Sequence, residues 1–185
     1  PDAQAAVKAG EYLAECMKNQ DSAGGVIECR ITGTPAGLGE PVFDKLSALL
    51  AHALMSIGAV KAVEIGDGIA VTSSNGSTDN DGFTVKDGEI IKTSNHAGGI
   101  MGGISDGSEI ILRAHIRATP AIGQPRQAGS KDKEPLSLEI HGRHDPVIVP
   151  RAVVVVESMA AITLADALFV NMSSQMEKVR DFYRK

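Results

Sequence analysis

The sequence predicts an α+β fold, in which a layered antiparallel β-sheet packs against helices. Two observations lead to this class. Apolar residues recur at helical spacing near both ends of the chain and in one central segment, whereas the segments between them are short and rich in β-branched residues. The links between the later strand-like segments are too short for crossover helices, so these strands are expected to pair in antiparallel fashion.

The length and composition fit one domain with an aliphatic core. The chain has 185 residues, of which 43% are apolar and only 3% aromatic. A chain of this length can bury most of the surface that its unfolded form exposes. We therefore expect a single domain over residues 1–185 whose core is built from Val, Ile, Leu, Ala and Met.

The first half of the chain alternates helices and strands. Residues 3–19 predict an amphipathic helix with Val7, Leu13, Cys16 and Met17 near one face. Residues 26–32 predict a strand. A helix is predicted over 41–57 because it begins with a proline, which suits a first helical turn, and ends before Gly58.

The next elements are strands. Residues 60–65 alternate, which predicts a strand with Val60, Ala62 and Glu64 on one face. Asp87-Gly88 between two β-branched runs predicts a tight hairpin. Strands are predicted at residues 83–85, 89–93, 109–116 and 136–140. A buried helix is predicted at residues 150–171 and an amphipathic helix at residues 174–184.

Two long polar segments are predicted to be mobile loops, at residues 72–82 and 119–135. The first is a run of Thr, Ser, Asn, Asp and Gly, and the second holds three prolines and a Lys-Asp-Lys-Glu run. Long polar loops in a compact domain usually carry function or are disordered.

Charge and cysteine content exclude several classes of protein. The net charge of -5, without a basic stripe, argues against nucleic-acid binding. We find no apolar run long enough to span a bilayer and no signal peptide, so no membrane partner is expected. Cys16 and Cys29 are too few for a disulfide framework, which favours reduced thiols in a cytoplasmic protein. The first residue is Pro1 rather than Met, so we expect that the chain has been cut.

Residues 94–107 hold five glycines between two β-branched runs. Glycine backbone can adopt positive φ and approach a ligand closely. The stretch is therefore either a cradle for a phosphate or a flat heterocycle, or a strand-to-strand connection with unusual dihedrals. It does not end in Gly-Lys-Ser/Thr and no helix follows, which argues against a P-loop.

Four arginines, Arg113, Arg117, Arg143 and Arg151, lie beside glycine-rich or loop segments. Guanidinium groups suit bidentate recognition of phosphate or carboxylate. The alternative is surface ion pairing with Glu109, Glu139, Asp145 and Glu157. His141, His144 and Asp145 have spacing too unspecific to indicate a metal site, and we predict none.

Several ordered segments together resemble the C-terminal half of the chorismate synthase family. They cover about residues 24–168 and comprise PAGLGEPVFDKL (35–46), VKAVEIGDG (60–68), SNHAGGI (94–100), GGIS (102–105), GRHDP (142–146) and VPRAV (149–153). The resemblance implies half of a β-α-β sandwich fold, in a cytoplasmic homotetramer. It also implies a lyase that eliminates phosphate (anti-1,4) from 5-enolpyruvylshikimate 3-phosphate to give chorismate, in aromatic amino acid biosynthesis, with reduced FMN as cofactor.

The resemblance also implies site residues. The flavin contacts carried over by motif are Gly58, Ala59, Gly102, Arg117, Ala118, Thr119, Pro120, Ala121 and Arg143. Asp145 is the candidate catalytic carboxylate that assists proton removal near the flavin. Its alternative is a turn aspartate that caps local N–H groups.

Two departures from the family pattern bear on function. The family usually has Lys-Pro-Thr-Pro/Ser-Ser-Ile where this chain has Arg117 to Ile122 (RATPAI), so Arg replaces Lys and Ala121 lacks a hydroxyl. The family's N-terminal half, with its two histidines, has no match in this chain. We therefore expect the chain alone to be inactive; the alternatives are a non-catalytic flavin- or phosphate-binding module and an assembly module.

Overall fold

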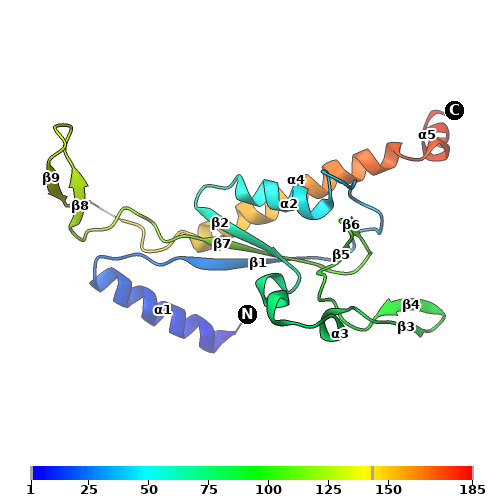
Figure 1. The fold of residues 1–185 in the computed structure, drawn as a ribbon, viewed down its shortest axis with the longest axis horizontal. Helices are drawn as coiled ribbons and strands as arrows, with labels where there is room; N and C mark the ends of the chain where they lie inside the picture. Colours follow the sequence, from blue (N-terminus) through cyan, green and yellow to red (C-terminus); the bar gives the residue numbers. More distant parts are fainter. Residues whose placement is uncertain (1, 143, 185) are drawn as a thin grey trace.

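The computed structural model describes residues 2–142 and 144–184 and confirms an α+β architecture. Its centre is a three-stranded antiparallel sheet in the order β1-β7-β2, formed by β1 (Gly25–Ile31), β7 (Ile110–Ile116) and β2 (Val60–Ile65). Figure 1 shows an elongated molecule in which hairpins extend from both ends of this sheet. The central strand is thus the one that comes last in sequence.

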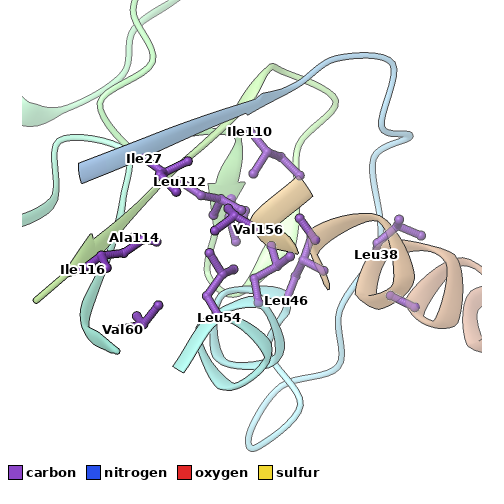
Figure 2. Close-up of a cluster of buried hydrophobic side chains, with 14 residues drawn as sticks. Ile27, Leu38, Leu46, Leu54, Val60, Ile110, Leu112, Ala114, Ile116 and Val156 are labelled. Atoms are coloured by element: carbon purple, nitrogen blue, oxygen red, sulfur yellow. The ribbon is translucent and has the colours of Figure 1, made fainter. Parts of the chain in front are cut away.

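Two helices, α2 (Leu46–Met55) and α4 (Val149–Ser173), cover one face of the sheet (Figure 1). Leu46 and Leu54 of α2 meet Val156 of α4 and Leu112 of β7 in the core, all fully buried (Figure 2). Burying each such side chain contributes about 1.5–3 kcal/mol. This aliphatic core agrees with the low aromatic content.

The predicted alternation of β2 is interrupted by a bulge. Val60 pairs with Ile116, but the next paired residue, Ala62, already faces His115, so Lys61 is the extra residue. The extra residue of a bulge moves the side chains that follow it to the opposite face of the strand. Val60, Val63 and Ile65 therefore all pack against the core, and the prediction that Val60 shares a face with Ala62 and Glu64 is wrong.

The second helix begins later than predicted. Residues 41–45 form a turn closed by a bridge between Glu40 and Asp44, and α2 starts at Leu46. Val42 and Phe43, assigned to the apolar face of the helix, are 72% and 88% exposed. The amide of Leu46 donates to Gly103 O, which sets where the helix begins.

The predicted loops contain regular structure. The segment 72–82 includes the end of a 3-10 helix, η1 (Gly68–Ser73), and the short α3 (Gly76–Asp79). The segment 119–135 includes β8 (Arg126–Gly129), which pairs with β9 (Pro135–Leu138). Both were predicted as loops because polar residues mask strand and helix patterns; their mobility stays a prediction.

The predicted Asp87-Gly88 hairpin is confirmed. It joins β3 (Phe83–Lys86) to β4 (Glu89–Lys92), and both turn residues have positive φ, as a tight two-residue turn requires. A second, smaller hairpin forms inside the glycine-rich stretch, from β5 (Ile100–Met101) and β6 (Ile104–Ser105).

The terminal helices are exposed. In α1 (Ala3–Lys18) only Cys16 is buried, while Val7 and Met17 face solvent, so the helix was predicted correctly but its apolar face is not covered within the described residues. The last helix, α5 (Met176–Tyr183), has no buried residue.

Helix α4 differs from its prediction in two respects. Only Val156, Ala160 and Ala167 are buried, so it is not a buried helix. It is also long and apolar enough, by length and composition alone, to cross a membrane, with a mean hydropathy of 2.0. The expectation that no such apolar run exists is therefore wrong.

Candidate functional site

Most of the predicted site residues lie at one end of the central sheet. β7 runs antiparallel to both of its neighbours, so the residues after β7 lie beside those that precede β1 and β2. The amide of Arg117 donates to Ala59 O at 3.0 Å. We call Gly58, Ala59 and Arg117 to Ala121 the sheet-end cluster.

Close backbone packing positions the loop after β7. A Cβ on Gly24 would lie 2.6 Å from Ile116 O and 3.1 Å from Ala118 N, so only glycine lets the two segments approach. Ser22 Oγ donates to Thr119 O at 2.6 Å. The main chain of residues 117–119 is thus held firmly beside the start of β1.

The sheet-end cluster has the groups that an anionic or polar ligand requires. Arg117 is exposed, and a Cβ on Gly58 would meet nothing within 4 Å. Thr119 Oγ1 is buried and has no hydrogen-bond partner among residues 2–142 and 144–184. A buried hydroxyl without a partner costs free energy, so a ligand that supplies one would be favoured here.

The structure brings Asp145 close to this end of the sheet. The amide of Ala23 donates to Pro146 O at 2.7 Å, which ties the turn after Asp145 to the segment before β1. The Asp145 carboxylate accepts a hydrogen bond from Arg151 Nη2 rather than capping local N–H groups. Arg143, the remaining predicted contact, lies outside the described residues.

The predicted arginine group does not form one cluster. Arg113 points to the polar face of the sheet, where it pairs with Glu28 at 2.9 Å and donates to Gly66 O at 2.6 Å. Arg151 pairs with Asp145. For these two residues the alternative of ion pairing holds, although Arg113 uses Glu28 rather than Glu109.

The glycine-rich stretch is anchored by a buried ion network. Lys92 Nζ lies 2.9 Å from both Asp81 Oδ2 and Asp106 Oδ2, and the side chains of Lys92 and Asp81 are 8% and 2% exposed. Asp81 also accepts from Ser94 Oγ and from the amides of His96 and Ala97. Burial alone would raise the pKa of Asp81, but Lys92, Ser94 and the two amides outweigh it and hold that pKa well below its usual range.

Glycine is required where this stretch crosses the end of β2. Gly66 has φ +60, and a Cβ there would collide with His96 O; a Cβ on Gly98 would collide with Gly66 N. Gly102, at the turn of the β5–β6 hairpin, has φ +60 but open space around it. Its conformation leaves backbone accessible to a ligand.

A cavity of about 390 Å³ lies beside this hairpin. Its lining includes Gly102, His96, Asp79 and the apolar side chains of Ile65, Val71, Ile100 and Met101. We call it the hairpin cavity. Its size lies within the range of small-molecule pockets.

The structure does not bring Gly102 together with the sheet-end cluster. Gly102 lies near the start of β7 and the N-terminal end of α2, whereas Arg117 and Gly58 follow their opposite ends (Figure 1). The seven residues of β7 span roughly 20 Å at the usual rise per residue. The predicted contacts therefore form two separate groups.

The histidine-rich turn carries no metal-ligand geometry. His141 lies 3.7 Å from Glu139 on the surface, and His144 Nε2 lies 3.0 Å from Ile140 O. Among residues 2–142 and 144–184, no group of three or more His, Cys, Asp or Glu side chains is placed to hold a metal ion.

Sequence reasoning missed the residues that organise the glycine-rich stretch. Asp81 was placed in a polar loop, and Lys92 at the end of a strand. His96 and Asp67 belong to the family-like segments 94–100 and 60–68, but nothing in the sequence indicates that Asp67 Oδ2 lies 2.6 Å from His96 Nδ1. The sequence signal that could have indicated these residues is the recurrence of Asp and Asn in several loop segments. These segments come together only in the folded chain.

Known proteins with similar sequence and structure identify the family. A family model described as chorismate synthase matches residues 1–169. The chorismate synthase of Agathobacter rectalis is 56% identical over 100% of this chain and 50% of its own length. That of Lachnoclostridium phytofermentans is 58% identical over 100% of this chain and 51% of its own length.

A solved structure extends this likeness to three dimensions. A structure titled "Crystal Structure of Chorismate Synthase" superposes with a TM-score of 0.73 and 31% identity, covering 94% of this chain and 46% of that one. The chain thus spans about half the length of the curated relatives it matches, in line with the half-length correspondence of its motifs. With the family model matching most of its length, the chain belongs to the chorismate synthase family.

Proposed function

We propose that this chain contributes one part of a chorismate synthase, a lyase that eliminates phosphate from 5-enolpyruvylshikimate 3-phosphate to give chorismate. The observation that carries the proposal is identity above 50% to chorismate synthases along the whole chain. The holoenzyme would be a cytoplasmic homotetramer. Because the chain spans about half of those relatives, we propose that it is inactive by itself.

The residues of the chain fit a flavin, and we propose reduced FMN as the cofactor. The sheet-end cluster combines an exposed guanidinium, an unpartnered buried hydroxyl and accessible backbone, a set that suits a phosphate group. Asp145 lies at the same end of the sheet as this cluster, so we assign FMN to the sheet-end cluster. Gly102 and the hairpin cavity lie roughly 20 Å away along β7, which is farther than one FMN molecule reaches from there.

The chain's own residues would act by positioning and by accepting a proton. The sheet-end cluster would hold reduced FMN, whose chemistry would be the transient loan of an electron to the substrate as phosphate leaves, with its return as the proton is lost. Asp145 is the carboxylate that we propose to assist proton removal, and Arg151 Nη2 orients it by a hydrogen bond. Arg117, and Arg143 by resemblance, would hold anionic groups of the cofactor or substrate.

The first experiment is an anaerobic titration of this chain with reduced FMN, with and without substrate, followed by a turnover assay. The assay is repeated after adding the remaining half of the Agathobacter rectalis relative as a separate polypeptide. We expect no chorismate from the chain alone and turnover from the mixture. Turnover by the chain alone would contradict the claim of inactivity, and a folded mixture without turnover would contradict the proposed function.

Two variants test the assigned roles in the mixture. Arg143→Ala is expected to weaken FMN binding. Asp145→Asn should lower kcat by about 100-fold or more, as for loss of a general base, with FMN affinity unchanged. If the chain binds FMN but Asp145→Asn leaves kcat unchanged, the result would instead favour the non-catalytic binding module.

Arg117→Lys with Ala121→Ser tests the departure from the family pattern. Restoring the ammonium group and the hydroxyl should tighten FMN binding, because the hydroxyl adds a donor beside the phosphate. Equal FMN affinity of the double variant and the unchanged chain would contradict this prediction.

A further inference from the structure

An apolar groove lies between the last two helices. Figure 1 shows α5 beyond the end of α4, at one end of the elongated molecule. The groove measures about 600 Å³, and its lining includes Phe169 and Met172 of α4 and Val179, Phe182 and Tyr183 of α5. Phe182 and Tyr183 are 78% and 76% exposed, and their rings meet edge to face with centroids 5.1 Å apart. We call this hollow the C-terminal groove.

The helix α5 is too short and too exposed to be stable without a further contact. It has eight residues, none of them buried. Isolated helices shorter than about 12–15 residues are marginal in water, and most helical stability in proteins comes from packing of an apolar face. Met176, Val179 and Tyr183, three and four residues apart, form such a face. We therefore expect another surface to pack against α5.

The charged residues beside this apolar face are complementary to a second copy of α5. Lys178 and Asp181 both line the C-terminal groove. In the described part of the chain, Asp181 pairs with Arg184 at 3.3 Å and not with Lys178. When two copies of α5 cross in antiparallel orientation with their midpoints together, Lys178 of each copy lies opposite Asp181 of the other. Glu177 and Arg180 meet in the same way on the other side of the apolar face, and such flanking charges set the partner and orientation of paired helices.

The segment that carries α5 is shared with only part of the family. The family model matches residues 1–169, so α5 lies outside the matched range. The relatives from Agathobacter rectalis and Lachnoclostridium phytofermentans match 100% of this chain, α5 included. A contact made through α5 is therefore expected in these relatives rather than throughout the family.

We propose that the C-terminal groove binds the α5 helix of a second copy of this chain in antiparallel orientation. Phe182 and Tyr183 of each copy supply the apolar contact, and Lys178 and Asp181 form ion pairs across the two-fold axis. The eight residues of α5 span about 12 Å, so the contact is small, and small interfaces are weak. The inference goes beyond the proposed function, because none of these residues belongs to the sheet-end cluster.

The experiment exchanges the charges on this side of α5. Sedimentation equilibrium of the full chain measures the dimerisation constant over about 5 μM to 1 mM, a range that suits a small interface. Lys178→Asp leaves two anions in each groove and Asp181→Lys leaves two cations, so each variant repels its own copy. We expect each variant alone to dimerise about tenfold more weakly or worse. An equimolar mixture of the two variants pairs unlike charges again and should dimerise within about threefold of the unchanged chain.

Two further variants separate this contact from other association. Lys131→Asp, in the turn between β8 and β9, makes the same change in net charge as Lys178→Asp and should dimerise like the unchanged chain. Phe182→Ala should weaken dimerisation by about tenfold, because it removes an aromatic anchor that is exposed in the single chain. Circular dichroism of each variant checks that the chain is folded. Association through other apolar surfaces would not respond to the exchange of charges.

Three results would overturn the proposal: no dimer of the unchanged chain over this concentration range, equal dimerisation of Lys178→Asp and Lys131→Asp, or no recovery in the mixture. The same variants are then mixed with the remaining half of the Agathobacter rectalis relative. If they weaken binding of that half and leave self-association unchanged, that half occupies the groove and the proposal is wrong. Turnover by the reconstituted enzyme tests the proposed function separately.

Discussion

At the scale of single residues, the buried pair of Lys92 and Asp81 has the largest expected effect on stability. Removing one member of a buried ion pair leaves the other charge uncompensated, at a cost of about 3–5 kcal/mol. That is a large fraction of the stability of an ordinary domain, about 5–15 kcal/mol.

Lys92→Met leaves both Asp81 and Asp106 without their cation and is therefore expected to lower the free energy of unfolding by about 3–5 kcal/mol. Asp81→Asn should lower it by less, because Lys92 keeps its pair with Asp106. The double variant should lose less than the sum, because once Lys92 is gone the loss of the Asp81 charge removes a buried anion that has no cation beside it. Urea unfolding of the four proteins measures both quantities. The exposed Asp132→Asn is the control, and additive losses would argue against a coupled pair.

His96 makes stability depend on pH near neutrality. Because its pKa is raised in the folded state above the ordinary 6.5, its contribution is fully present below the unfolded pKa. That contribution is lost as the pH rises through the raised, folded-state pKa.

We expect an NMR titration of His96 to give a pKa above 6.5. Asp67→Asn should lower that pKa, because the hydrogen-bonding carboxylate is its main cause, and should flatten the stability change over the same pH window. An unchanged His96 titration in Asp67→Asn would contradict the pairing.

At the scale of elements, the crossing between the end of β2 and residues 96–98 determines where the glycine-rich stretch lies. Gly66 and Gly88 both have positive φ, but only Gly66 has backbone atoms where a Cβ would be. A Cβ at Gly88 would meet nothing within 4 Å. Alanine variants at Gly66 and Gly88 therefore distinguish the cost of conformational strain from the cost of steric collision.

Gly88→Ala is expected to cost about 1–2 kcal/mol, the left-handed strain alone. Gly66→Ala should cost clearly more, because His96 O and Gly98 N must move. Thermal unfolding of both variants checks this, and equal losses would mean that the crossing yields easily.

Many of the helices and strands could be predicted from the sequence. The Asp87-Gly88 hairpin, strand β7 and helix α4 have local signals that the fold preserves. The bulge at Lys61 and the late start of α2 could not be predicted, because each depends on a partner distant in sequence, His115 and Gly103 respectively. For the same reason the Asp81–Lys92 pair was missed, whereas the grouping of Ala59 with Arg117 follows once the strand order is known.

At the scale of the whole molecule, α4 presents an outer face that the described residues do not cover. Val154, Ile162 and Phe169 on this face are 61%, 64% and 68% exposed. Exposed apolar patches of this kind mark contact surfaces or cause aggregation. A chain that spans half of its relatives is expected to show this behaviour when isolated.

We expect the isolated chain to bind a hydrophobic dye and to associate with increasing concentration. Ile162→Lys with Phe169→Lys should suppress both effects while leaving the free energy of unfolding within about 1 kcal/mol, because both side chains are exposed. Light scattering and dye fluorescence measure this. Val156→Lys, which places a charge in the core, is the contrasting variant and should unfold the chain.

The position of β7 between β1 and β2 also has a consequence for synthesis on the ribosome. Both earlier strands take their main-chain partner from a strand that is translated after them, and the core helix α4 comes later still. At typical elongation rates the time between the synthesis of β1 and that of β7 is on the order of ten seconds. During that time β1, β2 and the apolar α2 are exposed without their final partners. Because α2 packs against α4, the nascent chain is expected to need chaperone protection until α4, which ends at Ser173, has left the exit tunnel.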